Sequence, residues 1–90
     1  MNMVSRTVLI TNRRGLHARA SAKFVTLASA QAIEVSVEKD GSSVTGTSIM
    51  GLMMLGAAMG DTITISAEGP DADAVVATMA ELVEARFGEE

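Results

Sequence analysis

The spacing of apolar residues changes along this chain between a period of two and a period near 3.6 residues, which divides it into seven short segments. Period-two alternation is clearest over residues 33–39, and helical spacing is clearest over residues 17–30 and beyond Pro70. The predicted strands are 3–11, 33–39, 42–46 and 62–67, and the predicted helices are 17–30, 49–55 and a last helix opened by Pro70 and Asp71. The predicted element order is therefore β-α-β-β-α-β-α.

This order predicts an α+β fold, in which one four-stranded antiparallel sheet carries three helices on a single face. Asp40-Gly41 marks a tight turn between the two middle strands. The faces of the two longer helices expected to pack on the sheet comprise Ala20, Phe24, Leu27, Ala28, Gln31, Val75, Met79, Leu82, Val83 and Phe87. Periodicity does not define the order of the strands, so a ferredoxin-like sheet is an open alternative.

Length and composition exclude several classes of protein. The 90 residues suffice for one domain, expected to span 1–90, and the absence of cysteine rules out disulfides and thiolate metal sites. Residues 1–11 lack the apolar core of a signal peptide, so we expect a cytoplasmic protein. Phe24 and Phe87 are the only aromatic residues, and the net charge is −4. Both facts disfavour nucleic-acid binding.

Charge is distributed unevenly along the chain. Residues 1–33 contain five cations and no acid, whereas residues 34–90 contain two cations and all eleven acids. The basic residues concentrate over 13–23, where they would attract an anion or an acidic partner surface. A solvated basic face is the simpler interpretation, and the position of His17 among these cations favours the anion.

His17 is the only histidine, and it stands where a predicted turn, residues 12–15, becomes a predicted helix. The first backbone N–H groups of a helix lack intrahelical partners, and the aligned peptide dipoles add positive charge there, so this position binds phosphate well. The same field disfavours the imidazolium ion, so we expect a neutral ring whose lone pair can attack phosphorus. Arg19, with its planar guanidinium, would hold the transferred group.

Other interpretations of His17 are a helix N-cap, a metal ligand or a hydrolase base. A lone histidine is more often a cap or a surface residue, but Gly15, the helix start and Arg19 together favour a phosphoryl acceptor. A metal is disfavoured because one histidine without cysteine or a nearby carboxylate gives too few ligands. A Ser-His hydrolase is disfavoured because no carboxylate lies near His17 in the sequence. Arg13 and Arg14 can be ordinary turn residues.

The predicted helix over 49–55 is apolar almost all the way round, whereas a surface helix needs only one buried stripe. If Leu52 and Leu55 face the core, four large side chains stay partly exposed, namely Ile49, Met50, Met53 and Met54. Exposed methionines form an adaptable docking surface, although a short helix buried on several sides has the same composition. Ser48 is expected to cap this helix, and its phosphorylation would place a dianion beside that surface.

Gly15-Leu16-His17-Ala18-Arg19 and, further along, the run from Ser48 to Gly56 (SIMGLMMLG) together resemble the HPr phosphocarriers of the phosphoenolpyruvate-dependent phosphotransferase system. The run from Asp61 to Gly69 (DTITISAEG) resembles the same family. Either of the first two motifs alone is weak, but both at this spacing are specific. The resemblance spans essentially the whole chain.

The resemblance implies the family's open-faced β-sandwich of four antiparallel strands and three helices. It implies that His17 accepts a phosphoryl group from enzyme I, itself charged by phosphoenolpyruvate, and passes it to an enzyme IIA protein, with Arg19 as phosphate partner. Ser48 matches the site of a regulatory kinase, HPr kinase/phosphorylase. Partner docking is expected at Ala18, Ile49, Met50, Met53 and Met54. Such a carrier is expected not to be an enzyme, to need no cofactor or metal, to bind no nucleic acid, not to insert into a membrane, and to act as a monomer.

Four positions depart from the family pattern. Ala20 stands where the family usually has proline, which keeps the helix but leaves the rigidity of its first turn open. Thr26 and Ser29 stand where many sugar-transport carriers have lysines, and Gly51 replaces another. These differences favour the nitrogen-related regulatory branch of the family.

Two functions from other classes are open alternatives. An allosteric binding module would act through Ser48 and the methionine-rich helix without phosphoryl transfer, and His17 would then be only a cap. A ferredoxin-like small-molecule sensor is a more distant alternative. The pairing of His17 with Arg19 favours the phosphocarrier, because neither alternative requires it.

Overall fold

The computed structural model describes residues 3–89, which form four strands, three α-helices and a closing 3₁₀ turn. The strands are β1 (Met3–Leu9), β2 (Val35–Lys39), β3 (Ser42–Thr45) and β4 (Thr62–Glu68), the helices are α1 (Ala18–Ser29), α2 (Ile49–Met54) and α3 (Ala72–Glu84), and the turn is Arg86–Gly88. This order of elements is the one predicted. Within the described residues, no helix has the length and apolar character needed to cross a membrane.

The strands form one sheet in the order β1-β4-β2-β3, and every neighbouring pair is antiparallel. β1 lies along the whole of β4, with Met3 opposite Glu68 and Leu9 opposite Thr62. Asp40 (φ 51°) and Gly41 (φ 84°) close the β2–β3 hairpin in the left-handed conformation that a tight two-residue turn requires. The strand that comes last in the chain therefore lies inside the sheet, next to the first.

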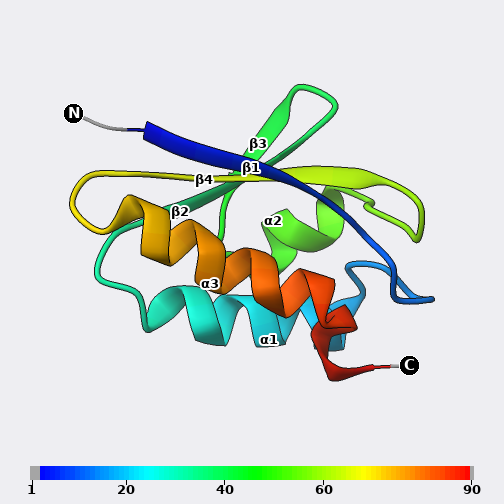
Figure 1. The fold of residues 1–90 in the computed structure, drawn as a ribbon. Coiled ribbons are helices and arrows are strands. Elements are labelled where there is room, and N and C mark those ends of the chain that lie inside the picture. Colours follow the sequence, from blue (N-terminus) through cyan, green and yellow to red (C-terminus); the bar gives the residue numbers. More distant parts are fainter. Residues whose placement is uncertain (1–2, 90) are drawn as a thin grey trace.

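All three helices lie on one face of this sheet, and the opposite face is open (Figure 1). The cause is that apolar and polar side chains alternate along the strands, so that one face of the sheet is apolar. β4 buries Ile63, Ile65 and Ala67 against the helices and directs Thr64 and Ser66 to the open face. α1 and α3 share one hydrophobic core with these strands. The prediction of an α+β fold with its helices on one face is confirmed.

Most residues of the predicted helix faces are buried. Leu27 and Leu82 are only half-buried, and Gln31 lies beyond the end of α1. Phe87 is fully buried, but it belongs to the turn after α3 and has a left-handed backbone (φ 55°) instead of continuing the helix. This turn directs the end of the chain towards the loop before α1 (Figure 1).

Several predicted element ends are wrong by one or two residues. β1 ends at Leu9, β2 begins at Val35 and β3 ends at Thr45, so all three strands are shorter than predicted. α1 begins one residue later than predicted, at Ala18. For the strands, the cause is that pairing with the neighbouring strand decides where a strand ends, whereas β-branched or apolar composition continues past the paired residues.

Candidate functional site

The loop before α1 is held against the loop after α2 at Gly15. Gly15 has φ +62°, and a Cβ atom there would lie 2.3 Å from the carbonyl oxygen of Ala57, so only glycine fits. The next residue, Leu16, donates its backbone N–H to that same oxygen at 2.9 Å. The start of α1 is therefore fixed beside the end of α2.

His17 is the N-cap of α1. Its backbone is extended, its carbonyl accepts the N–H of Ser21 at 2.9 Å, and its ring Nδ1 accepts the backbone N–H of Arg19 at 3.3 Å. The side chain is 20% exposed. The cap interpretation is thus correct as geometry, and the cap places a ring nitrogen at the positive end of the helix.

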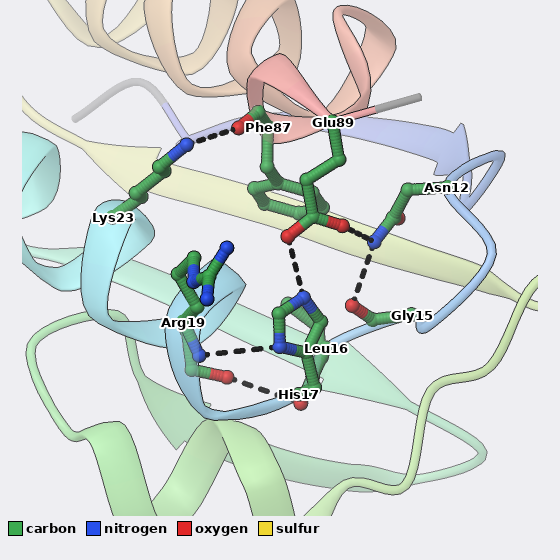
Figure 2. A network of polar contacts seen from close by, with 9 residues as sticks. Asn12, Gly15, Leu16, His17, Arg19, Lys23, Phe87 and Glu89 are labelled. Atoms are coloured by element: carbon green, nitrogen blue, oxygen red, sulfur yellow. Dashed lines mark hydrogen bonds and ion pairs between the residues drawn. The ribbon is translucent and has the colours of Figure 1, made fainter.

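The other ring nitrogen of His17 contacts a carboxylate from the end of the chain. Glu89 Oε2 lies 2.5 Å from His17 Nε2, and the Glu89 side chain is 18% exposed. Asn12, which is fully buried, donates its Nδ2 to Glu89 Oε1 at 3.0 Å and to the carbonyl of Gly15 at 2.9 Å. In Figure 2 the carboxylate of Glu89 lies between the His17 ring and the Asn12 side chain and contacts both.

The turn Arg86–Gly88 positions Glu89. Arg86, Phe87 and Gly88 all have positive φ, and the buried ring of Phe87 fixes the turn in the core. Lys23 Nζ donates to the Phe87 carbonyl at 2.7 Å (Figure 2). The hydrogen bond from Asn12 lowers the pKa of the Glu89 carboxyl below its ordinary 4.5; the contact with His17 and the charge of Lys23 act in the same direction, while burial opposes them. Glu89 is therefore ionised at neutral pH.

Three arginines converge on His17. Arg13, Arg14 and Arg19 line a hollow of about 310 Å³ together with His17 and Glu89. All three arginines are exposed, and none of them forms an ion pair with another of the described residues. Three of the four basic residues over 13–23 therefore line a hollow with the histidine, and Arg13 and Arg14 are part of this candidate site as well as of the turn.

Ser48 caps α2 as predicted. Its Oγ accepts the backbone N–H of Gly51 at 2.9 Å. Leu52 and Leu55 face the core, so the four large residues expected to be exposed are so, at 41% to 80%. We call this group, Ile49, Met50, Met53 and Met54, the methionine surface. Ala18 is exposed at the start of α1, which packs against α2.

The four unusual positions fit the fold. Ala20 is the third residue of α1 and is fully buried; its N–H is among those that a helix leaves without an intrahelical partner, so alanine and proline can both stand there without loss of a helix hydrogen bond. Thr26 and Ser29 are exposed on α1. A Cβ atom at Gly51 would lie 3.0 Å from Ser48 Oγ, so glycine keeps room for the cap.

Glu89 and Asn12 are the site residues that the sequence did not indicate. Glu89 is separated from His17 by 72 positions, and neither Glu89 nor Asn12 stands in a recognisable motif. No carboxylate lies near His17 along the chain, but the carboxylate of Glu89 lies next to its ring in space. Among the described residues, no group of three or more histidine, aspartate or glutamate side chains is placed to hold a metal ion.

Comparison with known proteins agrees with this geometry. A family model described as PTS HPr component phosphorylation site matches residues 4–85. Phosphocarrier protein HPr of Cupriavidus necator is 42% identical over 97% of this chain and 98% of the relative. Phosphocarrier protein NPr of Shewanella violacea is 40% identical over 99% of this chain and 98% of the relative. A crystal structure of HPr-C-His from Thermoanaerobacter tengcongensis matches with a TM-score of 0.88 and 43% identity, covering 100% of this chain and 99% of that one.

These similarities decide between the alternatives left open by the sequence. The fold is that of HPr structures, so the ferredoxin-like sheet is rejected. The family carries a phosphoryl group and is not catalytic in its own right. The chain belongs to the HPr family of phosphocarrier proteins of the phosphotransferase system.

Proposed function

We propose that His17 is the residue of this carrier that accepts the phosphoryl group, taking it from enzyme I and passing it to an enzyme IIA protein. The observation that carries the proposal is the position of its ring. It lies at the start of α1, inside the hollow lined by three arginines, with Nδ1 3.3 Å from the backbone nitrogen of Arg19. A helix N-terminus surrounded by guanidinium groups favours a dianion.

We assign the attack on phosphorus to Nδ1 of His17. In the free carrier the Nδ1 lone pair accepts the N–H of Arg19. As the Nδ1–P bond forms, the bond between phosphorus and the donor atom of enzyme I breaks, and its electron pair stays with the donor. The Arg19 N–H can then turn to a phosphoryl oxygen, so the helix start loses no hydrogen bond. Transfer to the acceptor reverses these changes.

Arg19 is proposed to hold the phosphoryl group during both transfers. Its guanidinium lines the hollow and is exposed, and Figure 2 shows the side chain reaching up beside the His17 ring and Glu89. A guanidinium can bind two phosphoryl oxygens at once. Arg13 and Arg14 are placed to attract the donor and to screen the charge from further away.

Docking is proposed to use Ala18 and the methionine surface. These side chains are exposed beside the start of α1, and methionine adapts to differently shaped partners. That adaptability suits a carrier that must bind both a donor and an acceptor. Since a second copy of the chain on this surface would block the partners, we propose that the carrier acts as a monomer. A cytoplasmic location is proposed from the sequence of residues 1–11 alone. Ser48 lies at its edge, where phosphorylation by a kinase would alter docking.

Thr26 and Ser29 support assignment to the nitrogen-related branch of the family. Both lie exposed on α1, where lysines of sugar-transport carriers would present positive charge. Acceptor preference tests this assignment: the phosphorylated carrier is mixed with a sugar-type or a nitrogen-type enzyme IIA. Faster transfer to the nitrogen-type acceptor is expected, and faster transfer to the sugar type would contradict the assignment.

The assignment of His17 is tested by incubating the carrier with enzyme I and phosphoenolpyruvate. Mass spectrometry should find one acid-labile, base-stable phosphate on the peptide that contains His17. A stable phosphate on Ser48, or no labelling at all, would overturn it. The second outcome, together with binding to a regulator, would support the allosteric module in which His17 is only a cap.

A further inference from the structure

We propose that Glu89 is a positioning residue that holds the His17 ring in the tautomer with its proton on Nε2, so that Nδ1 is the nitrogen that attacks. The inference rests on the proposed function of His17 and deepens it. It concerns how the carrier selects one of two ring nitrogens that are chemically similar in a free imidazole.

The two contacts of the His17 ring are compatible with one neutral tautomer. Glu89 Oε2, 2.5 Å from Nε2, is a carboxylate oxygen and can only accept, so Nε2 must carry a hydrogen. The backbone N–H of Arg19 can only donate, so Nδ1 must present its lone pair. The carboxylate on one side and the helix start on the other therefore enforce the same arrangement.

The carboxylate of Glu89 is itself held in place. Asn12 is fully buried and donates Nδ2 to both Glu89 Oε1 and the carbonyl of Gly15. Its Oδ1 has no partner within the part of the chain that is described. Rotating the amide by half a turn would bring Oδ1 against two acceptors, so the two acceptors fix the orientation of Asn12. The buried ring of Phe87 anchors the turn Arg86–Gly88, and with it Glu89, against the hydrophobic core.

Glu89 also has a role as the bond to phosphorus forms. The lone pair of Nδ1 leaves the ring for phosphorus, so positive charge develops on the imidazole and is shared with Nε2–H. The Glu89 carboxylate, already at hydrogen-bond distance from Nε2, stabilises this charge without moving. When the phosphoryl group departs, the electron pair returns to Nδ1. No proton has to move in either direction.

Asn12 makes the substitution Glu89→Gln a sharp test. A glutamine side chain has one acceptor and one donor group in place of two acceptors. Because Asn12 donates, the oxygen of the introduced amide will face Asn12, and its NH₂ group will face Nε2. This NH₂ group favours a lone pair on Nε2 and a proton on Nδ1, and it now competes with the Arg19 N–H, which still favours a lone pair on Nδ1. Glu89→Gln should shift the ring towards the Nδ1–H tautomer, whereas Glu89→Ala should leave a mixture.

The experiment measures the tautomer and the transfer rate in the full chain. ¹⁵N shifts of the His17 ring in the free protein should report Nε2–H for wild type and a shift towards Nδ1–H for Glu89→Gln. The initial rate of labelling by enzyme I should fall about 10- to 100-fold, the size of effect typical of carboxylates that orient metal-binding histidines, with docking affinity unchanged. Glu81→Gln removes the same charge from an exposed position of α3 and should change neither quantity.

Each outcome separates this inference from the proposed function. If wild type takes no phosphate on His17, the proposed function fails, while the tautomer of the free protein can still be measured. If wild type is labelled on His17 and the tautomer and rate of Glu89→Gln match those of wild type, the role of Glu89 is refuted alone. If Glu89→Gln unfolds early in a thermal scan, the tautomer mixture of Glu89→Ala decides the question.

Discussion

Two helices of this carrier begin with the same backbone arrangement and different surroundings. His17 at the start of α1 and Ser48 at the start of α2 are both extended, and each accepts a backbone N–H of its own first turn through the side chain, at 3.3 Å and 2.9 Å. Around His17 lie arginines and a carboxylate from the chain end. Around Ser48 lies the apolar methionine surface.

The difference shows that a cap is defined locally, whereas its chemistry is defined by what the fold places around it. The capping serine accepts one N–H of the helix start and places a neutral hydroxyl next to an apolar surface. The capping histidine accepts one N–H with Nδ1, and its Nε2 is held by a carboxylate. Only the second arrangement places an imidazole, the nucleophile that we propose, in a hollow lined by guanidinium groups.

The largest effect is expected from removing the histidine cap. His17→Ala should abolish labelling by enzyme I and keep the fold, with the free energy of unfolding lower by about 1 kcal/mol from loss of the cap. Ser48→Ala is the matched control, since it removes a cap of similar energy and should still be labelled. Residual acid-labile phosphate on His17→Ala would show that another residue is the acceptor.

Arg19→Ala should slow transfer by about 100-fold, because a charged donor to the phosphoryl group is lost. Docking to enzyme I should weaken much less, since Arg19 acts on the moving group. Stopped-flow transfer kinetics and a binding titration measure the two effects separately. Arg13→Ala, which changes a second arginine of the same hollow, should act mainly on association at low salt. Equal losses of rate and affinity in Arg19→Ala would mean that Arg19 mainly steers association.

A negative charge at Ser48, the cap of α2, should weaken docking to enzyme I and leave the fold intact. Ser48→Asp is expected to weaken binding of enzyme I about tenfold, because the carboxylate is desolvated at the edge of the methionine surface and is repelled if the facing surface of enzyme I is acidic, as the basic residues over 13–23 suggest. The melting temperature should hold or rise, since a helix start favours an anion. Titrations at low and high salt should show a smaller effect at high salt.

The control for Ser48→Asp is Ser42→Asp, which adds the same charge on the exposed β2–β3 hairpin. It should bind enzyme I as wild type does. Unchanged affinity of Ser48→Asp at both salt concentrations would show that Ser48 is only a cap in this protein.

The smallest expected effect is a pH dependence of the free energy of unfolding. We expect it from the Glu89 contact at His17, the cap of α1, and not from Ser48, the cap of α2. Contacts lower the pKa of Glu89 in the folded protein below its unfolded value near 4.5. Its contribution to stability is therefore present above pH 4.5 and is lost as the pH falls through the folded pKa. Urea unfolding should show wild type more stable than Glu89→Gln at pH 7, with the difference shrinking as the pH falls below 4.5. The deficit of Ser48→Ala should stay constant over this range, and a constant deficit in Glu89→Gln would contradict the assigned contact.

Most of the fold was predictable because its signals are local. Alternation in β4, the Asp40-Gly41 turn and the apolar stripes of α1 and α3 each depend on neighbours in the chain. Strand ends were less predictable, because Thr11 and Ile33 continue the β-branched pattern without pairing. Phe87 was correctly predicted to be buried and wrongly placed on a helix, since a left-handed turn has no hydrophobic period.

The residues of the candidate site also fall into two groups, those that local sequence predicts and those that only the tertiary structure brings together. Gly15, His17 and Arg19 stand within five consecutive positions, and the start of a helix is itself a local event, so the sequence alone predicted the proposed phosphoryl acceptor, the positive field and the arginine beside it. The tertiary structure decided the order of the strands, the gathering of Arg13 and Arg14 around the ring, and the carboxylate on Nε2. Glu89 reaches His17 only because Phe87 enters the core and turns the last described residues back towards the start of α1. Contacts between residues far apart in the chain depend on that path, which no local pattern encodes.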